Sequence, residues 1–235
     1  LGSPKDGGVR RMRSGQDSQS PVIRVRNLVI GYSPKDPLAE IPSLDIFPGE
    51  IVAIAGPSGI GKTTLINTLV DMDAKDSGDI KWSMNANIGF FSQDAEENID
   101  SDLSLIDWMG QWSDSSDTEQ EIRSVLGKLL FSKDDIHKPI NVLSGGEKRR
   151  MLFGKIIMQQ PNVIIMDEPT NHLDMESIES LNSALSQYEG TLLFASHDRE
   201  FISSLATRVI ELKPGKMLDH LRSGEEELSQ INIDI

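Results

Sequence analysis

The sequence of 235 residues contains no cysteine, which excludes disulfides, thiolate metal sites and thiol catalysis. No apolar run approaches the roughly 20 residues that a membrane-spanning helix needs, and no secretory signal pattern opens the chain. Positive charge is in the minority, with 23 Lys and Arg against 37 Asp and Glu and a formal net charge of −14. This balance argues against a broad nucleic-acid-binding face but leaves room for a local basic patch. We therefore expect a soluble, cytoplasmic protein or subunit with no direct membrane insertion.

The order of the apolar patterns predicts a single α/β domain, for which the chain is long enough. Val22–Leu28 alternates apolar and polar residues, as a half-buried strand does. Continuous apolar runs at 51–55, 163–166 and 192–195 are separated by amphipathic helical stretches, a pattern typical of a mostly parallel sheet. Helical patterns cluster between about 101 and 160, which indicates a helical subdomain inserted into the α/β core.

Shorter strand patterns and the chain ends complete this organisation. We expect Ile80–Trp82 and Ile88–Phe91 to form a pair of neighbouring strands. Residues 1–20 are rich in Gly, Ser, Lys and Arg and lack an apolar period, so we expect a flexible tail or linker there. Residues 214–235 are expected to form a C-terminal tail, which leaves 21–213 as the ordered domain.

The most informative motif is a complete G-x-x-x-x-G-K-[ST] phosphate-binding loop. It stands between the apolar run 51–55 and a helical pattern that begins at Thr64, the position that phosphate binding at a helix N-terminus requires. Its residues are Gly56, Pro57, Ser58, Gly59, Ile60, Gly61, Lys62 and Thr63. Lys62 is expected to bind the β- and γ-phosphates, and the Thr63 hydroxyl to bind Mg²⁺. A glycine-rich turn that binds nothing is the alternative, and the flanking strand and helix argue against it.

A second chemical pair, Asp167 and Glu168, ends the buried apolar run 163–166. A carboxylate at the end of such a strand is the other half of a phosphate-loop site, where Asp167 would help to hold Mg²⁺. Glu168 is then in position to orient or deprotonate the attacking water. The pair alone is weak support for this interpretation, but it becomes strong beside a phosphate-binding loop.

The segment Leu143–Glu147 precedes a helical pattern and contains Ser144, Gly145 and Gly146. It resembles the signature motif of ABC ATPases, in which these positions bind the γ-phosphate of a nucleotide held by the opposite domain. A serine hydroxyl, glycine N–H groups and a helix N-terminus all favour an anion, whereas an ordinary helix cap is the alternative interpretation. The resemblance implies a P-loop NTPase fold with an N-terminal antiparallel β subdomain, and ATP with Mg²⁺ as the bound ligands.

The resemblance runs over residues 22–212 and assigns further roles. Gln93 matches the glutamine that touches Mg²⁺ and the attacking water, and His197 matches the histidine that contacts the γ-phosphate. The segment 171–174 matches the loop that crosses a dimer interface. Tyr32 matches the aromatic residue that stacks on adenine, although a tyrosine at a strand end also commonly fills a core.

Several segments indicate one branch of the family. Residues 168–174, with the sequence EPTNHLD, and residues 147–150 resemble the ABC-F branch, whose members are soluble twin-ATPase proteins that act on the ribosome. Residues 175–182 are especially similar to the second ATPase domain of YbiT-like members. In contrast, Ser58 stands where ABC-F proteins usually have Asn, and residues 22–67 resemble a transporter ATPase subunit more closely.

The resemblance therefore implies ATP hydrolysis at a site shared with a second ABC ATPase domain, supplied in cis or by a homodimer. Membership of the ABC-F branch would add the ribosome, with its rRNA and tRNA, as a partner. The alternative is the ATPase subunit of a membrane transporter, paired with a permease. A non-catalytic nucleotide-binding module is a third hypothesis, against which Glu168 and His197 argue.

Overall fold

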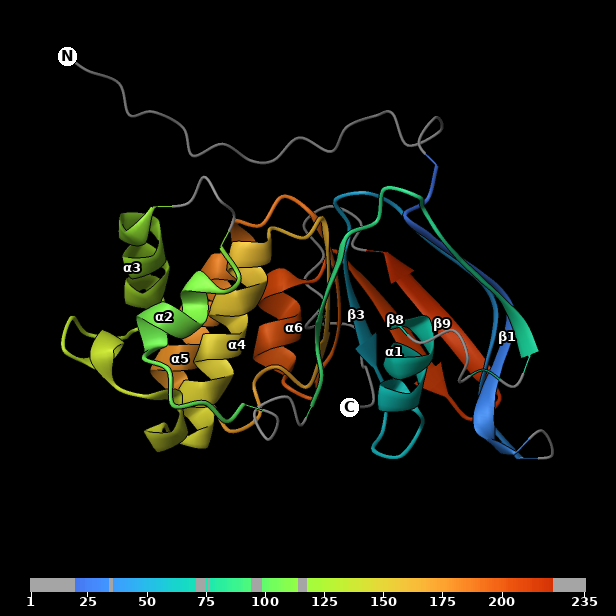
Figure 1. Cartoon of the computed structure of the whole chain (residues 1–235). Helices are drawn as coiled ribbons and strands as arrows, with labels where there is room; N and C mark the ends of the chain where they lie inside the picture. The colour runs from blue at the N-terminus through green and yellow to red at the C-terminus, as the bar shows by residue number, and fades with distance from the viewer. Residues whose placement is uncertain are drawn as a thin grey trace, which may run out of the picture.

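The structure, a computed structural model, describes residues 20–33, 36–70, 75, 77–93, 99–113 and 118–221. It combines a central six-stranded sheet, a separate antiparallel sheet and a group of helices (Figure 1). The expected α/β class, the mostly parallel sheet and the N-terminal antiparallel subdomain are confirmed. No helix in these ranges combines the length and the apolar character needed to cross a lipid bilayer.

The central sheet has the strand order β5-β6-β7-β3-β8-β9. Its strands are β3 (Ile51–Ala55), β5 (Ile88–Phe91), β6 (Val163–Asp167), β7 (Thr191–Ala195), β8 (Arg208–Lys213) and β9 (Lys216–Leu221). The neighbours from β5 to β8 pair in parallel, and only β9 runs antiparallel to β8. Every residue of β3, β6 and β7 is buried, because helices cover both faces of a parallel sheet, and the side chains on both faces are therefore mostly apolar.

The two faces of the central sheet contribute to two apolar clusters. Helix α1 (Lys62–Val70) packs on one face, where Leu65, Ile66 and Leu69 join inward side chains of β3 and β6. Helices α4 (Gly145–Gln159), α5 (Met175–Ser186) and α6 (Arg199–Leu205) lie on the opposite side in Figure 1. Ile156 and Phe201 belong to this second cluster. The sheet is therefore fixed between helices, which holds its strand ends in place.

The antiparallel sheet has the order β2-β1-β4, with strands β1 (Ile23–Ser33), β2 (Asp36–Ile46) and β4 (Ser77–Trp82). The expected pairing of Ile80–Trp82 with Ile88–Phe91 is wrong. The first segment pairs with β1, where Ile80 lies opposite Val25, and the second pairs with β6. The reason is burial: β4 exposes alternate residues as an antiparallel strand does, whereas Ile88–Phe91 completes the edge of the parallel sheet.

Trp82 joins the antiparallel sheet to α1. Its indole Nε1 donates to the carbonyl oxygen of Leu69, near the end of α1, at 3.0 Å. The other two tryptophans, Trp108 and Trp112, lie far along the sequence in the helical region and contact each other edge to face, with ring centroids 5.8 Å apart. The indole side chains thus mark two different parts of the fold.

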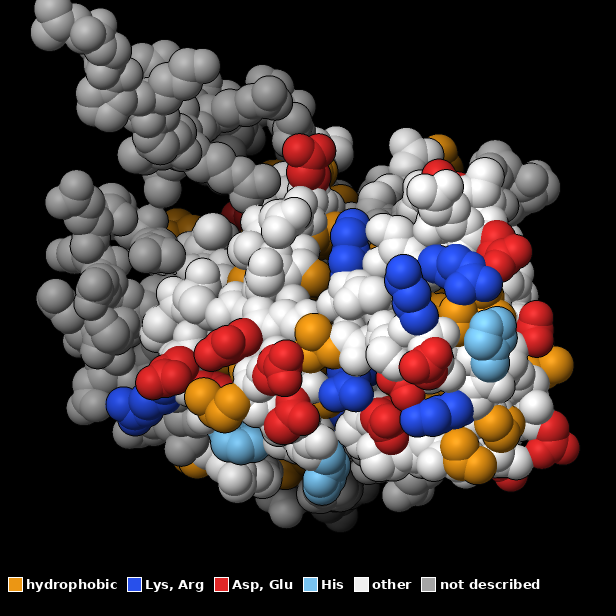
Figure 2. Space-filling view, turned by 90° about the vertical axis from the view of Figure 1, so that its left-hand side faces the viewer, with side chains coloured by type: hydrophobic (Ala, Val, Ile, Leu, Met, Phe, Trp, Pro, Cys, Tyr) orange, Lys and Arg blue, Asp and Glu red, His pale blue; other side chains and the backbone are white. Residues whose placement is uncertain are grey.

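Helices predominate among the described residues of 105–113 and 118–159. The chain forms α2 (Leu105–Gly110), α3 (Glu119–Lys128), 3₁₀ turns at Asp135–His137 and Ile140–Val142, and α4. Helix α3 begins at a capping box formed by Thr118 and Glu121, and it buries Ile122, Val125 and Leu126 as its apolar spacing predicts. The molecular face on this side mixes acidic and basic side chains over short distances (Figure 2).

The sheet continues past residue 213, where the sequence predicts the ordered domain to end. Strand β9 forms a hairpin with β8 through a turn in which Gly215 has a φ of 68°, a conformation that suits glycine. Arg208 on β8 donates two hydrogen bonds to the Asp219 carboxylate on β9, at 2.8 and 2.6 Å. The turn and this bidentate ion pair explain why the polar segment 216–221 is a strand.

Candidate functional site

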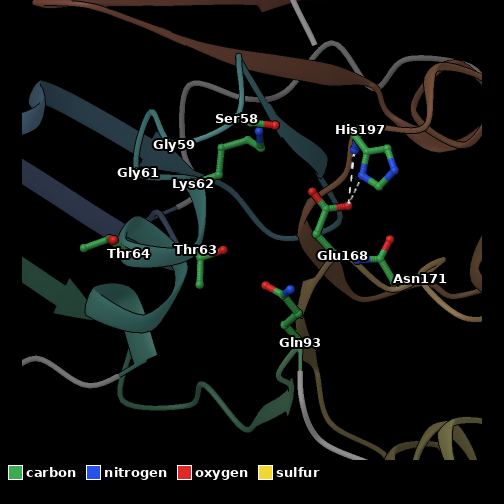
Figure 3. Close-up of a pocket in the computed structure, with 10 residues that line it drawn as sticks. All are labelled: Ser58, Gly59, Gly61, Lys62, Thr63, Thr64, Gln93, Glu168, Asn171 and His197. Atoms are coloured by element: carbon green, nitrogen blue, oxygen red, sulfur yellow. Dashed lines mark hydrogen bonds and ion pairs between the residues drawn. The ribbon is translucent and has the colours of Figure 1, made fainter. Parts of the chain in front are cut away.

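An open cavity of about 430 Å³ lies at the carboxyl ends of the parallel strands (Figure 3). Ligand sites of open α/β sheets lie at this edge because the loops after neighbouring strands meet there. The segments that follow β3, β5, β6 and β7 all contribute to it. Its lining residues are Ser58, Gly59, Gly61, Lys62, Thr63, Thr64, Gln93, Glu168, Asn171 and His197.

The phosphate-binding loop connects β3 to α1 along one side of the cavity. Gly56 has a φ of 146°, and a Cβ there would lie 2.6 Å from the Leu212 carbonyl oxygen on β8, so only glycine fits this position. Lys62 Nζ donates to the carbonyl oxygens of Gly56 and Pro57 at 2.6 and 3.4 Å. Gly56, Pro57 and Ile60 do not line the cavity. The first two instead hold the ammonium group at its edge.

Glu168 lies opposite the loop, directly after β6. Its backbone has a φ of 47°, a left-handed conformation that costs a non-glycine residue about 1–3 kcal/mol and persists only where its surroundings hold it. Three backbone contacts do so: Glu168 N–H donates to Ala195 O at 3.0 Å, and Glu168 O accepts from Asn171 N–H at 3.2 Å and from Arg149 at 2.8 Å. The carboxylate is thereby fixed at the cavity wall with only 12% of its side chain exposed.

His197 contacts Glu168 from the end of β7. The imidazole Nδ1 lies 2.8 Å from Glu168 Oε2, and the His197 N–H donates to the same oxygen at 3.3 Å (Figure 3). An ionised carboxylate only accepts hydrogen bonds, so in that state of Glu168 the contact requires the imidazole proton on Nδ1. One carboxylate oxygen is thus held by His197, while the other oxygen of Glu168 remains directed toward the loop in Figure 3.

The predicted magnesium ligands supply three oxygens of different kinds. Thr63 has a hydroxyl and Gln93 an amide oxygen, and both residues line the cavity. Asp167 does not line it: this carboxylate is 1% exposed at the end of β6. The described ranges contain no group of three or more His, Cys, Asp or Glu residues that could hold a metal. Mg²⁺ keeps several waters and binds one or two carboxylates plus substrate phosphates, so this set of donors fits that ion.

Ser144, Gly145, Gly146 and Glu147 are separated from this cavity and do not line it. They begin α4 with a capping box, in which the Ser144 hydroxyl donates to Glu147 Oε2 at 2.7 Å and the Ser144 N–H donates to the same oxygen at 2.8 Å. Both hydrogen bonds favour the ionised carboxylate and lower the pKa of Glu147. The signature segment therefore has its own anion in place at the helix N-terminus.

Tyr32 and Arg149 differ in how they relate to the predicted site. The side chain of Tyr32 lies outside the described part of the chain, so its contact with adenine stays a prediction. Arg149 was not predicted to belong to the site, yet it is fully buried and contacts the backbone of Gln93 and Glu168. A signal for this burial existed, because Arg149 precedes Phe153 and Ile156 at the helical spacing i, i+4, i+7 of an apolar stripe.

Comparisons with known proteins agree with this geometry. The model of the ABC transporter family matches residues 40–171, more than half of the chain. The chain is 53% identical to the ATP-binding protein YbiT of Escherichia coli O157:H7 over 212 residues, which are 90% of this chain and 40% of YbiT. It is 34% identical to ABC transporter F family member 5 of Arabidopsis thaliana, over 90% of this chain and 30% of that protein.

A solved structure has the same fold. It is an ATP-binding cassette described as a dimer in a post-hydrolysis state with ADP and Pi, and it superposes with a TM-score of 0.69 at 21% identity over 86% of this chain and 99% of its own. The chain spans less than half the length of the curated relatives named above. The relatives agree with the predicted resemblance to the ABC-F branch, and the family match shows that the chain belongs to the ABC transporter family.

Proposed function

We propose that the cavity binds ATP with Mg²⁺ and that the domain hydrolyses it. The observation that carries this proposal is the meeting of Lys62, Thr63, Gln93, Glu168 and His197 around one open space. These residues come from four separate segments of the sequence, and each supplies a group that phosphoryl transfer to water needs. The fold alone would not support an activity, whereas this combination of groups does.

Each side chain has a role that follows from its surroundings. The Lys62 ammonium exchanges its carbonyl partners for phosphate oxygens, and the N–H groups at the start of α1 face the same anion. Glu168 accepts a proton from the attacking water through the carboxylate oxygen that His197 does not hold. His197 keeps that carboxylate in one orientation with its Nδ1 proton.

The magnesium ion would be held by Thr63, Gln93 and Asp167. When bound, Mg²⁺ neutralises charge on the phosphate oxygens and helps to orient them. The hydroxyl, amide and carboxylate groups are hard oxygen donors, which this ion prefers. Removal of Mg²⁺ by a chelator should therefore weaken ATP binding and stop turnover.

The signature segment suggests a second domain as the partner. Ser144–Glu147 do not line the cavity of their own chain, so a nucleotide bound there would not contact them. A signature segment at that nucleotide would have to come from a second domain. We propose that a second ABC ATPase domain, in cis or as a homodimer, brings its signature onto this nucleotide. A dimer is what the name of the solved relative describes for that protein.

A single substitution tests hydrolysis separately from binding. Glu168→Gln should lower kcat by about 10²–10⁴-fold, the usual contribution of a general base, and should leave Mg-ATP binding intact. The variant should also accumulate as an ATP-bound dimer, measured by light scattering with and without ATP. A variant that turns over ATP at the parental rate would show that Glu168 is not the base.

We further propose that the domain belongs to a cytoplasmic ABC-F protein that acts on the ribosome. The similarity to YbiT and to the F family member, together with the sequence at 168–174, supports this choice over a transporter subunit. The test is co-sedimentation of the Glu168→Gln protein with ribosomes in Mg-ATP and in ADP. ATP-dependent sedimentation would support the proposal. Binding to permease-containing membranes, with no ribosome binding, would support the transporter alternative instead.

A further inference from the structure

Arg149 is a buried cation with an unusual position in the site. Its side chain is 0% exposed. One terminal nitrogen donates to the carbonyl oxygen of Gln93 at 3.0 Å, and the other donates to the carbonyl oxygen of Glu168 at 2.8 Å. Gln93 follows β5 and Glu168 follows β6, so a single guanidinium group joins the two segments whose side chains face the cavity.

The surroundings of Arg149 fix the guanidinium plane. It lies 4.9 Å from the centre of the Phe91 ring, and that ring stacks on Phe153 at 4.3 Å with an angle of 7° between the planes. A buried charge is costly to desolvate, and an ordinary apolar side chain would fill this space without that cost. The planar fork of an arginine can reach two carbonyl oxygens at once, which the single ammonium of a lysine cannot do in the same geometry.

Arg149 also belongs to the helix that begins at the signature segment. It lies in the second turn of α4, whose N-cap is Ser144. The start of α4 also lies close to the segment that follows Glu168. A Cβ on Gly146 would be only 3.1 Å from the His172 carbonyl oxygen in that segment. The start of α4 is therefore packed against the same backbone that positions Glu168.

We propose that Arg149 is a positioning residue that couples the two halves of the composite site. It holds Gln93 and Glu168, which face the nucleotide of this chain, in a fixed relation to Ser144, which faces the nucleotide of a second domain. A shift of either segment when the cavity fills is passed to α4 through one rigid group. The proposal rests on the function proposed above, and its test includes one measurement that does not depend on ATP.

The test compares three variants of the 235-residue chain. Arg149→Met keeps the length and removes both donors, and Arg149→Lys keeps the charge but can reach one carbonyl. Arg150→Met is the matched control, because Arg150 is the next residue on α4 and instead donates to Ser177 at 2.8 Å and lies over Phe131. All three proteins are first checked for native circular dichroism and assayed well below their melting temperatures.

The first measurement is steady-state ATP hydrolysis together with ATP binding. Arg149→Met should lower kcat by about 10-fold or more, because small displacements of catalytic groups have effects of up to about 100-fold, while the Kd for Mg-ATP changes by about twofold or less. The kcat of Arg149→Lys should lie between those of the parent and of Arg149→Met. Arg150→Met should keep the parental kcat. A folded Arg149→Met protein with the parental kcat, or an Arg150→Met protein with an equal loss, would overturn the proposal.

The second measurement is amide hydrogen exchange without nucleotide. Arg149→Met should speed the exchange of amides at 91–93 and 168–173 and of the first turn of α4, with β3 and β7 unchanged. Uniform acceleration over the whole domain would indicate a general loss of packing and would overturn the positioning role. If the parent binds no ATP but the local exchange changes as expected, the proposed function fails and the positioning role of Arg149 stands.

Discussion

The N-termini of α1 and α4 are two anion-binding positions with different contents. Helix α1 begins with Lys62, Thr63 and Thr64, has no acidic residue in its first turn, and opens onto the cavity. Helix α4 begins after Ser144, and the Glu147 carboxylate already accepts hydrogen bonds from that residue. The first helix therefore presents its positive end to an incoming phosphate, whereas the second satisfies it internally.

The two helix ends differ in what an incoming phosphate must displace. A phosphate can bind at α1 without displacing any side-chain anion from the first turn of the helix. At α4 the Ser144 hydroxyl must leave Glu147 before it can donate to a phosphate, and the Glu147 charge repels that phosphate.

The largest expected effect is on α1. Lys62→Ala should weaken Mg-ATP binding by about 100-fold or more, because a charge-assisted partner of the phosphates is lost. Isothermal titration calorimetry on the isolated domain measures this change. Lys148→Ala removes the same type of side chain from α4 and should leave the affinity unchanged; an equal loss in both variants would show that net charge, not position, decides binding.

Alanine substitutions of glycine at the two helix starts should change the free energy of unfolding in opposite directions. Gly61 has a φ of 100° and its added Cβ would lie 3.2 Å from the Leu38 Cβ, so Gly61→Ala should lower the free energy of unfolding by about 1–3 kcal/mol. Gly145 is helical and an added Cβ meets nothing within 4 Å, so Gly145→Ala should raise it by about 0.4–1 kcal/mol. Urea denaturation measures both changes in unfolding free energy. Two changes in the same direction would contradict the expected difference between the helix starts.

The capping box of α4 should contribute a moderate amount of stability. Ser144→Ala removes the hydroxyl that accepts from the Glu147 N–H and donates to its carboxylate, and the loss of an N-cap costs about 1 kcal/mol. The change is measured by urea denaturation without nucleotide. ATP affinity should stay at the parental level, since Ser144 does not line the cavity at α1. A large drop in affinity would mean that the N-terminus of α4 contributes to ATP binding in the same chain.

The smallest expected effect is a pH dependence at Glu147. Its folded pKa lies below the usual value for glutamate because the hydroxyl and the N–H of Ser144 both donate to the ionised carboxylate. A lowered pKa adds stability that is complete above the unfolded pKa and is lost as pH falls through the folded pKa. The difference in unfolding free energy between parent and Glu147→Gln should be about 0.3–1 kcal/mol at pH 7 and should shrink in acid. A difference that grows below pH 4 would contradict this sign.

The sequence, with its resemblance to ABC ATPases, placed most of the side chains that line the cavity in one site, but it assigned Asn171 to a dimer interface, whereas Asn171 also lines the cavity. The phosphate loop and Glu168 follow buried strands, and the resemblance adds Gln93 and His197 after two further strands of the same sheet; the carboxyl ends of parallel strands meet at one edge. The pairing of Ile80–Trp82 was predicted wrongly, because three residues are too few for their alternation to select the antiparallel over the parallel sheet. Which sheet this segment joins depends on contacts between residues far apart in the sequence.

Other features depend on tertiary packing as well. The left-handed φ of Glu168 has no sequence signature, since glutamate rarely adopts it and hydrogen bonds with Ala195, Asn171 and Arg149 stabilise it there. The burial of Arg149 is similar: helix periodicity marks its face, but a charged residue on that face is normally read as solvated. Strand β9 was missed because its ion pair with Arg208 is formed across a turn rather than along an apolar run.

The hydrogen bond from Trp82 to α1 has a practical consequence. Its indole reports on the far end of the helix whose first residue, Lys62, stands at the cavity, whereas Trp108 and Trp112 form a pair in the helical region. The chain has three tryptophans in all. Tryptophan-to-phenylalanine variants that keep only one of these two groups therefore provide built-in fluorophores, one beside α1 and the other in the helical region.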